Sequence, residues 1–176
     1  MELLFGMRVE DGVGHQAGTL DRVLVDVRLE SVSHVVVRPP EVSEDVLVPL
    51  SLVQGAEDGT LRLRVSADEL RQLPMYLEGK SGGPCARVDS ALAGSAGVGN
   101  DIVELGPDTT LAGAEGVRMP LAGVGIETGA PIIDVLYGGN GRERARVPAA
   151  WIVELREDVV ALDASGNEPR ETARQR

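Results

Sequence analysis

Aromatic residues and cysteine are scarce in this chain. Phe5, Tyr76, Tyr137 and Trp151 are the only aromatic residues among 176. A core with so few rings must be aliphatic, and the many valines and leucines suit the pleated surface of a β-sheet. The single cysteine, Cys85, excludes an intrachain disulfide, so nothing requires an oxidising compartment. The composition therefore predicts an all-β fold, and we expect a cytoplasmic protein.

Clustered basic charge and long apolar runs are also missing. The chain has 28 acidic and 17 basic residues, a formal net charge of −11, and Lys80 is its only lysine. Nucleic-acid backbones are bound mainly through clustered Lys and Arg, so we expect no direct nucleic-acid binding. No apolar run approaches the roughly 18 residues of a spanning helix, and no basic, apolar leader is seen. We expect no membrane insertion, while attachment to a peripheral membrane complex stays open.

Period-two alternation indicates strands in the first half. Leu61–Val65 reads LRLRV, with leucine and valine on one face and arginine on the other. The Asp58-Gly59 pair before it suits a two-residue hairpin turn, so we expect Val46–Val53 to pair with Leu61–Val65. Another hairpin is predicted between Thr19–Arg28 and Ser33–Pro39. His34 would lie on the strand face opposite Val35 and Val37.

One short helix and a linker follow. Ser66 is a good N-cap with Glu69 three residues later, and Pro74 ends the pattern, so SADELRQLP predicts a short helix. Residues 77–100 are rich in Gly, Ala and Ser and predict a flexible linker. Alternation then returns, and further strands are expected within Ala130–Gly138, Arg144–Leu155 and Val159–Ser165.

The two halves repeat each other. A shift of about 99 residues aligns Val48-Pro49 with Val147-Pro148, and Leu61–Leu63 with Val160–Leu162. Upstream the copies diverge, and the second has no counterpart in sequence to the early hairpin of the first. The repeat predicts duplicated domains. A lone barrel of about 70 residues is marginal, so two copies that share an apolar face, within one chain or across a dimer, would relieve that limit.

The first copy resembles a known family. Gly6-x-x-Val9 is followed by AGTLDRVLVD, VSHVVVRP, DVLVPLSLV, DGTLRL and SADELRQLP, and this order resembles the PRC-barrel domain over Leu3–Pro74. Residues 116–163 resemble a second, shortened copy. The resemblance implies two small β-barrels of about six strands each, in tandem. The expected domains are a barrel at 1–76, a linker at 77–100, a shortened barrel at 101–165 and a disordered tail at 166–176.

The family suggests several roles without selecting one. PRC-type barrels occur in the cytoplasmic part of the photosynthetic reaction-centre H subunit and in a ribosome-maturation factor. We expect a non-enzymatic protein-binding or scaffold module that forms homo-oligomers, with an unknown protein partner. The alternatives are an accessory protein of a membrane electron-transfer complex and a ribosome-maturation factor acting through a ribosomal protein.

No motif predicts catalytic, cofactor-binding or metal-binding residues. The Gly-Lys-Ser at 79–81 would need a glycine where Pro74 stands, which argues against a phosphate-binding loop. His15 and His34 have no partner at ligand-like spacing, and Cys85 has no evident base. Acidic pairs such as Glu10-Asp11 sit at turns, where they favour solubility and helix capping. We therefore expect no enzyme activity.

Three residues are candidates for partner binding. Trp151 takes the place that Leu52 holds in the first copy, and tryptophan is enriched at interface hot spots. Met75 and Tyr76, just beyond the predicted helix, form a second candidate docking point. For all three residues, packing in the core is the competing interpretation.

Overall fold

The computed structural model describes residues 1–26, 31–40, 44–76, 102–112 and 118–126, together with the backbone of four later strands. Within these residues helix is confined to two short pieces, and the all-β prediction is confirmed. The elements are β1 (Glu2–Leu4), β2 (Arg8–Glu10), β3 (Gln16–Asp26), β4 (Ser31–Arg38), β5 (Val46–Pro49), the 3-10 helix η1 (Leu50–Leu52), β6 (Val53–Glu57), β7 (Thr60–Leu63), α1 (Ala67–Leu70), β8 (Ile102–Leu105), β9 (Thr110–Ala112), β10 (Arg118–Ile126), β11 (Ile133–Tyr137), β12 (Ala145–Val147), β13 (Ile152–Leu155) and β14 (Val159–Leu162).

The first sheet has the strand order β5-β4-β3-β2-β7-β6, and β8 also pairs with β3. The predicted hairpin between β3 and β4 is present. Asp58 and Gly59 join β6 to β7 with φ of 50° and 74°, as a two-residue hairpin turn requires. The expected pairing of Val46–Val53 with Leu61–Val65 is wrong for its first part. β5 pairs with β4 instead, because η1 turns the chain before β6 begins.

The second sheet has the same connectivity. Its order is β12-β11-β10-β9-β14-β13, and β1 also pairs with β10. Each sheet contains one parallel pair at the corresponding position, β2 with β7 in the first sheet and β9 with β14 in the second. The sequence comparison found no counterpart to the early hairpin, but the structure has one in β9 and β10. The residues diverge there while the strand pairing is kept.

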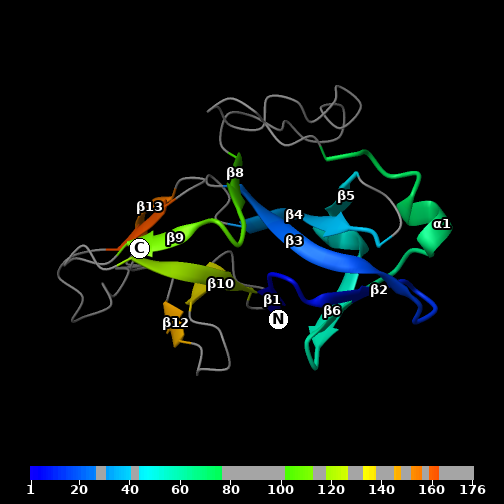
Figure 1. Cartoon of the computed structure of the whole chain (residues 1–176), viewed down its shortest axis with the longest axis horizontal. Helices are drawn as coiled ribbons and strands as arrows, with labels where there is room; N and C mark the ends of the chain where they lie inside the picture. The colour runs from blue at the N-terminus through cyan, green and yellow to red at the C-terminus, as the bar shows by residue number, and fades with distance from the viewer. Residues whose placement is uncertain are drawn as a thin grey trace, which may run out of the picture.

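Two strands are exchanged between the halves. β1 precedes β2 in the chain but lies in the second sheet, next to β10, whereas β8 lies in the first sheet, next to β3 (Figure 1). The sheets therefore do not follow the expected boundary between 1–76 and 101–165. The expected linker and tail lie outside the described residues.

One apolar core runs through both sheets. Its buried members come from the first half, such as Val9 and Leu61, and from the second half, such as Leu111 and Val124. A smaller cluster lies on the other face of β3, β4 and β5. It consists of Leu24, Val36, Leu47, Tyr76 and Ile102. Alternation along β4 explains this division, because Val35 and Val37 face the large core and Val36 faces the small cluster. By the same alternation His34 lies on the face of Val36, opposite Val35 and Val37, as predicted.

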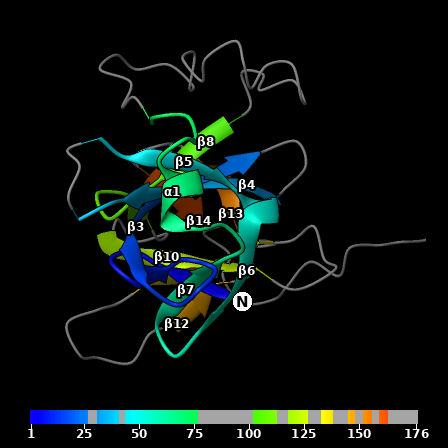
Figure 2. The ribbon, with the colours of Figure 1, turned by 90° about the vertical axis from the view of Figure 1, so that its right-hand side faces the viewer.

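The predicted short helix is α1, and it covers one end of the first sheet (Figure 2). Ser66 and Glu69 form a reciprocal capping box at its N-terminus, and Leu70 is buried in the large core. Leu73, in the turn that follows, packs against the same core.

Candidate functional site

A shallow groove lies between α1, the start of β3 and the end of β4. Its volume is about 90 Å³, and its lining residues are Gln16, Ala17, Pro39, Pro40, Ala67, Leu70 and Arg71. Five of these side chains are apolar, and the two polar ones are exposed. The groove can therefore accept apolar atoms and has polar groups available to a bound partner.

Asp11 holds the helix and the neighbouring loop at this end of the sheet. Its carboxylate accepts hydrogen bonds from the backbone N–H of Val13 (3.0 Å), His15 (2.8 Å) and Ala67 (3.3 Å). The last of these is the first N–H of α1, so Asp11 supports the helix start from 56 residues away in the chain. The acidic turn pairs were expected to favour solubility and helix capping, but the burial of Asp11 and its contact with Ala67 were not predicted.

The same hydrogen bonds set the charge of Asp11. Burial acts to raise the pKa of Asp11, but the backbone donors of His15, Val13 and Ala67 outweigh it, and the pKa lies below its ordinary value. Val13 and His15 themselves project from the loop, with exposed fractions of 71% for Val13 and 80% for the His15 side chain. An apolar and an ionisable side chain therefore stand on the loop that Asp11 fixes.

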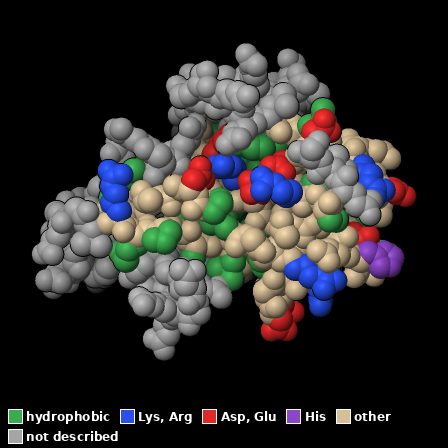
Figure 3. Space-filling view, viewed as in Figure 1, with side chains coloured by type: hydrophobic (Ala, Val, Ile, Leu, Met, Phe, Trp, Pro, Cys, Tyr) green, Lys and Arg blue, Asp and Glu red, His purple; other side chains and the backbone are tan. Residues whose placement is uncertain are grey.

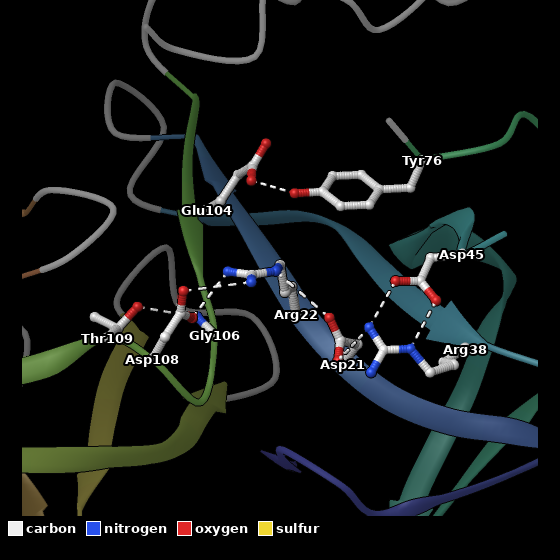
Figure 4. A network of polar contacts seen from close by, with 9 residues as sticks. All are labelled: Asp21, Arg22, Arg38, Asp45, Tyr76, Glu104, Gly106, Asp108 and Thr109. Atoms are coloured by element: carbon white, nitrogen blue, oxygen red, sulfur yellow. Dashed lines mark hydrogen bonds and ion pairs between the residues drawn. The ribbon is translucent and has the colours of Figure 1, made fainter. Parts of the chain in front are cut away.

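A charged network crosses the outer face of the first sheet. Figure 4 shows Arg38 between Asp45 and Asp21, and Arg22 between Asp21 and Asp108. The nitrogen–oxygen distances are 2.9 Å for Arg38–Asp45, 3.1 Å for Arg38–Asp21, 3.4 Å for Arg22–Asp21 and 2.9 Å for Arg22–Asp108. Acidic and basic side chains also gather together in the upper middle of the face in Figure 3. Burial raises the pKa of Asp21, and the nearby Arg38 opposes that rise.

A buried phenol and carboxylate lie beside this network. The hydroxyl of Tyr76 donates a hydrogen bond to Glu104, and both residues are buried (Figure 4). Tyr76 precedes residues 77–101 and Glu104 follows them, so the contact joins the two ends of that segment. Tyr76 and Ile102 also share the small apolar cluster.

The partner-binding candidates have different surroundings. Met75 is 56% exposed, and Tyr76 is only 8% exposed, with its ring in the small cluster. The structure therefore does not present Tyr76 as part of a surface. Trp151 lies outside the described residues.

The groove and the support from Asp11 were missed by sequence reasoning. Pro39-Pro40 marks the end of a strand, but nothing in the sequence indicates that it faces α1. Asp11 stands in a turn like the other acidic pairs, and only the approach of Ala67 distinguishes it.

Among the described residues, no group of three or more His, Cys, Asp or Glu side chains is placed to hold a metal ion. Burial lowers the pKa of His34, on the face of the small cluster. No helix in the described ranges is long and apolar enough to cross a membrane.

Comparison with known proteins adds no relative. No family model matches the chain, and neither does any curated protein sequence.

Proposed function

We propose that this protein is a non-enzymatic protein-binding module built from two PRC-type barrels, and that it self-associates. The shared connectivity of the two sheets supports a duplication, since each path contains six strands in the same order. The capped helix that follows β7 supports the family assignment of the first half, because the resembling sequence ends in that segment.

The size and lining of the groove carry the proposal of protein binding. Drug-sized molecules and cofactors occupy pockets of roughly 300–1,000 Å³. A groove of about 90 Å³ instead suits one apolar side chain. Protein partners commonly bind by inserting such an anchor into a small pocket that is surrounded by polar residues. Ala17, Pro39 and Leu70 would contact the anchor, and Arg71 and Gln16 would stand at its rim.

Charge and exposure indicate where the partner would lie. Asp68 and Glu69 are exposed on α1 next to the groove, and the chain carries a formal net charge of −11. A partner with basic residues around an apolar anchor would complement this end of the molecule. Val13 and Met75, both exposed, provide further apolar contact near the loop and helix that frame the groove.

A blocked groove tests this proposal. Pro40 is exposed and has no backbone N–H to lose, so Pro40→Arg should place a long cation across the groove without unfolding the sheet. Gln54→Arg adds the same charge to an exposed residue of β6 that does not line the groove, and it is the matched control. Circular dichroism would first show that both variants fold.

The readout is native fractionation of source-cell lysate containing tagged wild type or variant. We expect the wild type and Gln54→Arg in a particle heavier than the protein's own oligomer, and Pro40→Arg in the free fraction. If Pro40→Arg stays in the heavy particle, the groove is not the binding site. If the wild type is always free, the proposal of a stable protein partner fails. Sedimentation with membranes or with ribosomal subunits would favour one of the two alternative roles.

A further inference from the structure

The exchange of β1 and β8 is reciprocal and extensive. β1 pairs with β10 from Glu2 to Leu4. Beyond the strand ends, the Met1 amino group donates to Ile126 O at 2.7 Å, and Phe5 N donates to Ala122 O at 3.0 Å. β8 pairs with β3 over four residue pairs, from Val23–Leu105 to Asp26–Ile102. Each half therefore completes the sheet of the other.

The large core depends on the same exchange. Leu3 of β1 and Leu105 of β8 are both fully buried, and they belong to one cluster with Leu121 and Val124 of β10. A half without its complement would expose this apolar surface and the paired strand edges to water. Each half therefore requires a complementary half to bury this surface.

The covalent link between the halves allows each half to pair with the other half of its own chain or with that of a second copy. The halves are joined by residues 77–101, here termed the connector. Its 25 residues could span up to about 80 Å if extended. In the structure its two ends are close together, since Tyr76 contacts Glu104. The connector can therefore close within one chain, or it can reach to a second molecule.

We propose that a second copy of this chain is a partner for each half, and that two copies form a dimer by exchanging halves reciprocally. Each unit of the dimer contains the first half of one copy and the second half of the other, with the same β1–β10 and β8–β3 pairs. This proposal specifies the mode of the self-association proposed above and rests on it. Exchange of identical elements creates a dimer without requiring a new surface.

The length of the connector sets the conditions under which the dimer forms. A link of 25 residues that is rich in Gly, Ala and Ser gives an effective concentration on the order of millimolar, so dilute protein closes within one chain. Refolding at about 1 mM should place on the order of half of the chains in the dimer. After dilution the dimer should persist, because separation requires the shared core to open.

The only lysine gives a direct test. Lys80 lies in the connector, so a lysine-specific protease cuts the full chain once, between the halves. The protein is unfolded, refolded at about 1 mM, diluted, and separated by size with mass measurement. The isolated dimer is then treated with the protease. We expect it to become particles of monomer mass, each containing residues 1–80 and 81–176 held together without a covalent link.

Two controls complete the test. Lys80→Arg keeps the charge and removes the cleavage site, so its dimer should keep its mass under the protease. Wild type that is cut at Lys80 in denaturant before refolding should give only monomer-mass particles at 1 mM, which covers the case in which the folded dimer resists cleavage. Gln54→Arg, which lies outside the groove and outside both exchanged strands, should form as much dimer as the wild type.

Two results would overturn the exchange. If the cut dimer keeps its dimer mass, the copies associate through surface faces, so self-association stands and the exchange of halves is wrong. If the uncut protein refolds only to monomer at every concentration up to 1 mM, both self-association and exchange are wrong. In that second case the groove would still be tested separately by the fractionation experiment.

Discussion

The strands β1 and β8 each cross to the sheet of the other half, β1 beside β10 and β8 beside β3. These two crossings have the same topology but different chemistry. In β3 and in β10 a bulge falls at the same place, between Leu20 and Arg22 in the first and between Leu121 and Gly123 in the second. Gly123 therefore stands in β10 where Arg22 stands in β3. A Cβ at Gly123 would come within 2.1 Å of the carbonyl oxygen of Leu3, so the backbone of β1 crosses in direct contact with β10.

At the other crossing, side chains occupy the corresponding space. Arg22 reaches over Gly106, just after β8, and its guanidinium pairs with Asp108. Tyr76 and Glu104 meet beside this pair (Figure 4). The comparison teaches that one connectivity can be held by close backbone packing on one side and by polar side chains on the other. The two crossings should therefore fail under different substitutions.

The largest effect is expected from a side chain at the close crossing. Gly123→Val would drive Cβ and its methyl groups into Leu3 and Leu4, which the strand pairing cannot accommodate. We expect the free energy of unfolding to fall by about 3 kcal/mol or more, measured by urea unfolding. Gly55→Val in β6 is the matched control, because no atom lies within 4 Å of its Cβ position. Equal stability of the two variants would show that β1 does not cross at Gly123.

A smaller effect is expected at the polar crossing from Tyr76→Phe. The change removes the hydroxyl and leaves the buried Glu104 carboxylate without that donor, which should cost about 1–3 kcal/mol of unfolding free energy. In a Glu104→Gln background the cost of Tyr76→Phe should be lower, because the neutral amide is less expensive to leave unpaired. Thermal unfolding of the four proteins measures the coupling, and strict additivity would contradict the pairing.

The ion pair at the same crossing should contribute less. Asp108 is 65% exposed, so solvent screens its attraction to Arg22, whereas Asp21, the other partner of Arg22, is 13% exposed. Arg22→Met should cost about 1 kcal/mol. The part of that difference that comes from Asp108 should disappear in 1 M salt. Arg62→Met is the comparison variant, since Arg62 is exposed and its contact with Glu10 is 3.9 Å long. A larger loss at Arg62 than at Arg22 would show that the network on β3 does not hold the crossing.

The weakest effect at neutral pH should come from Asp11→Asn. Its amide oxygen can replace Oδ1, which accepts from Val13 and His15, so only the longer 3.3 Å hydrogen bond from Ala67 to Oδ2 is lost. The consequence appears in acid. Since the pKa of Asp11 is lower in the folded protein than in the unfolded chain, its contribution is present above the unfolded pKa and is lost as pH falls through the folded pKa. Wild type should therefore lose more stability in acid than Asp11→Asn. Parallel stability curves from pH 6 to below the ordinary aspartate range would contradict this role.

Local features of the fold could be predicted from the residues. Asp58-Gly59 adopts the positive φ angles expected of a hairpin turn, and Ser66 with Glu69 forms the expected capping box. The alternation in β7 correctly separates core from surface, and the alternation in β4 separates the face of the large core from the face of the small cluster. Each of these signals depends on residues within a few positions of one another. The all-β class follows from the same local alternation.

Longer-range pairing could not be predicted in this way. The first part of Val46–Val53 was expected to pair with Leu61–Val65, but it forms β5 and pairs with β4. Alternation defines the faces of a strand but not the strand beside it. The early hairpin of the second half was missed because β9 and β10 keep the pairing of β2 and β3 with different residues. Neither the groove nor the burial of Tyr76 has a local signal.

The sequence by itself therefore determined the class of structure, the turns, the helix cap and the faces of several strands, because these depend on short-range sterics and on periodic burial. The tertiary structure alone decided that β1 and β8 change sheets, that Gly123 must remain without a side chain, and that Asp11 supports α1. These features depend on which distant segments meet. That choice is made by the burial of a shared core and by the pairing of backbone groups over more than a hundred residues of chain.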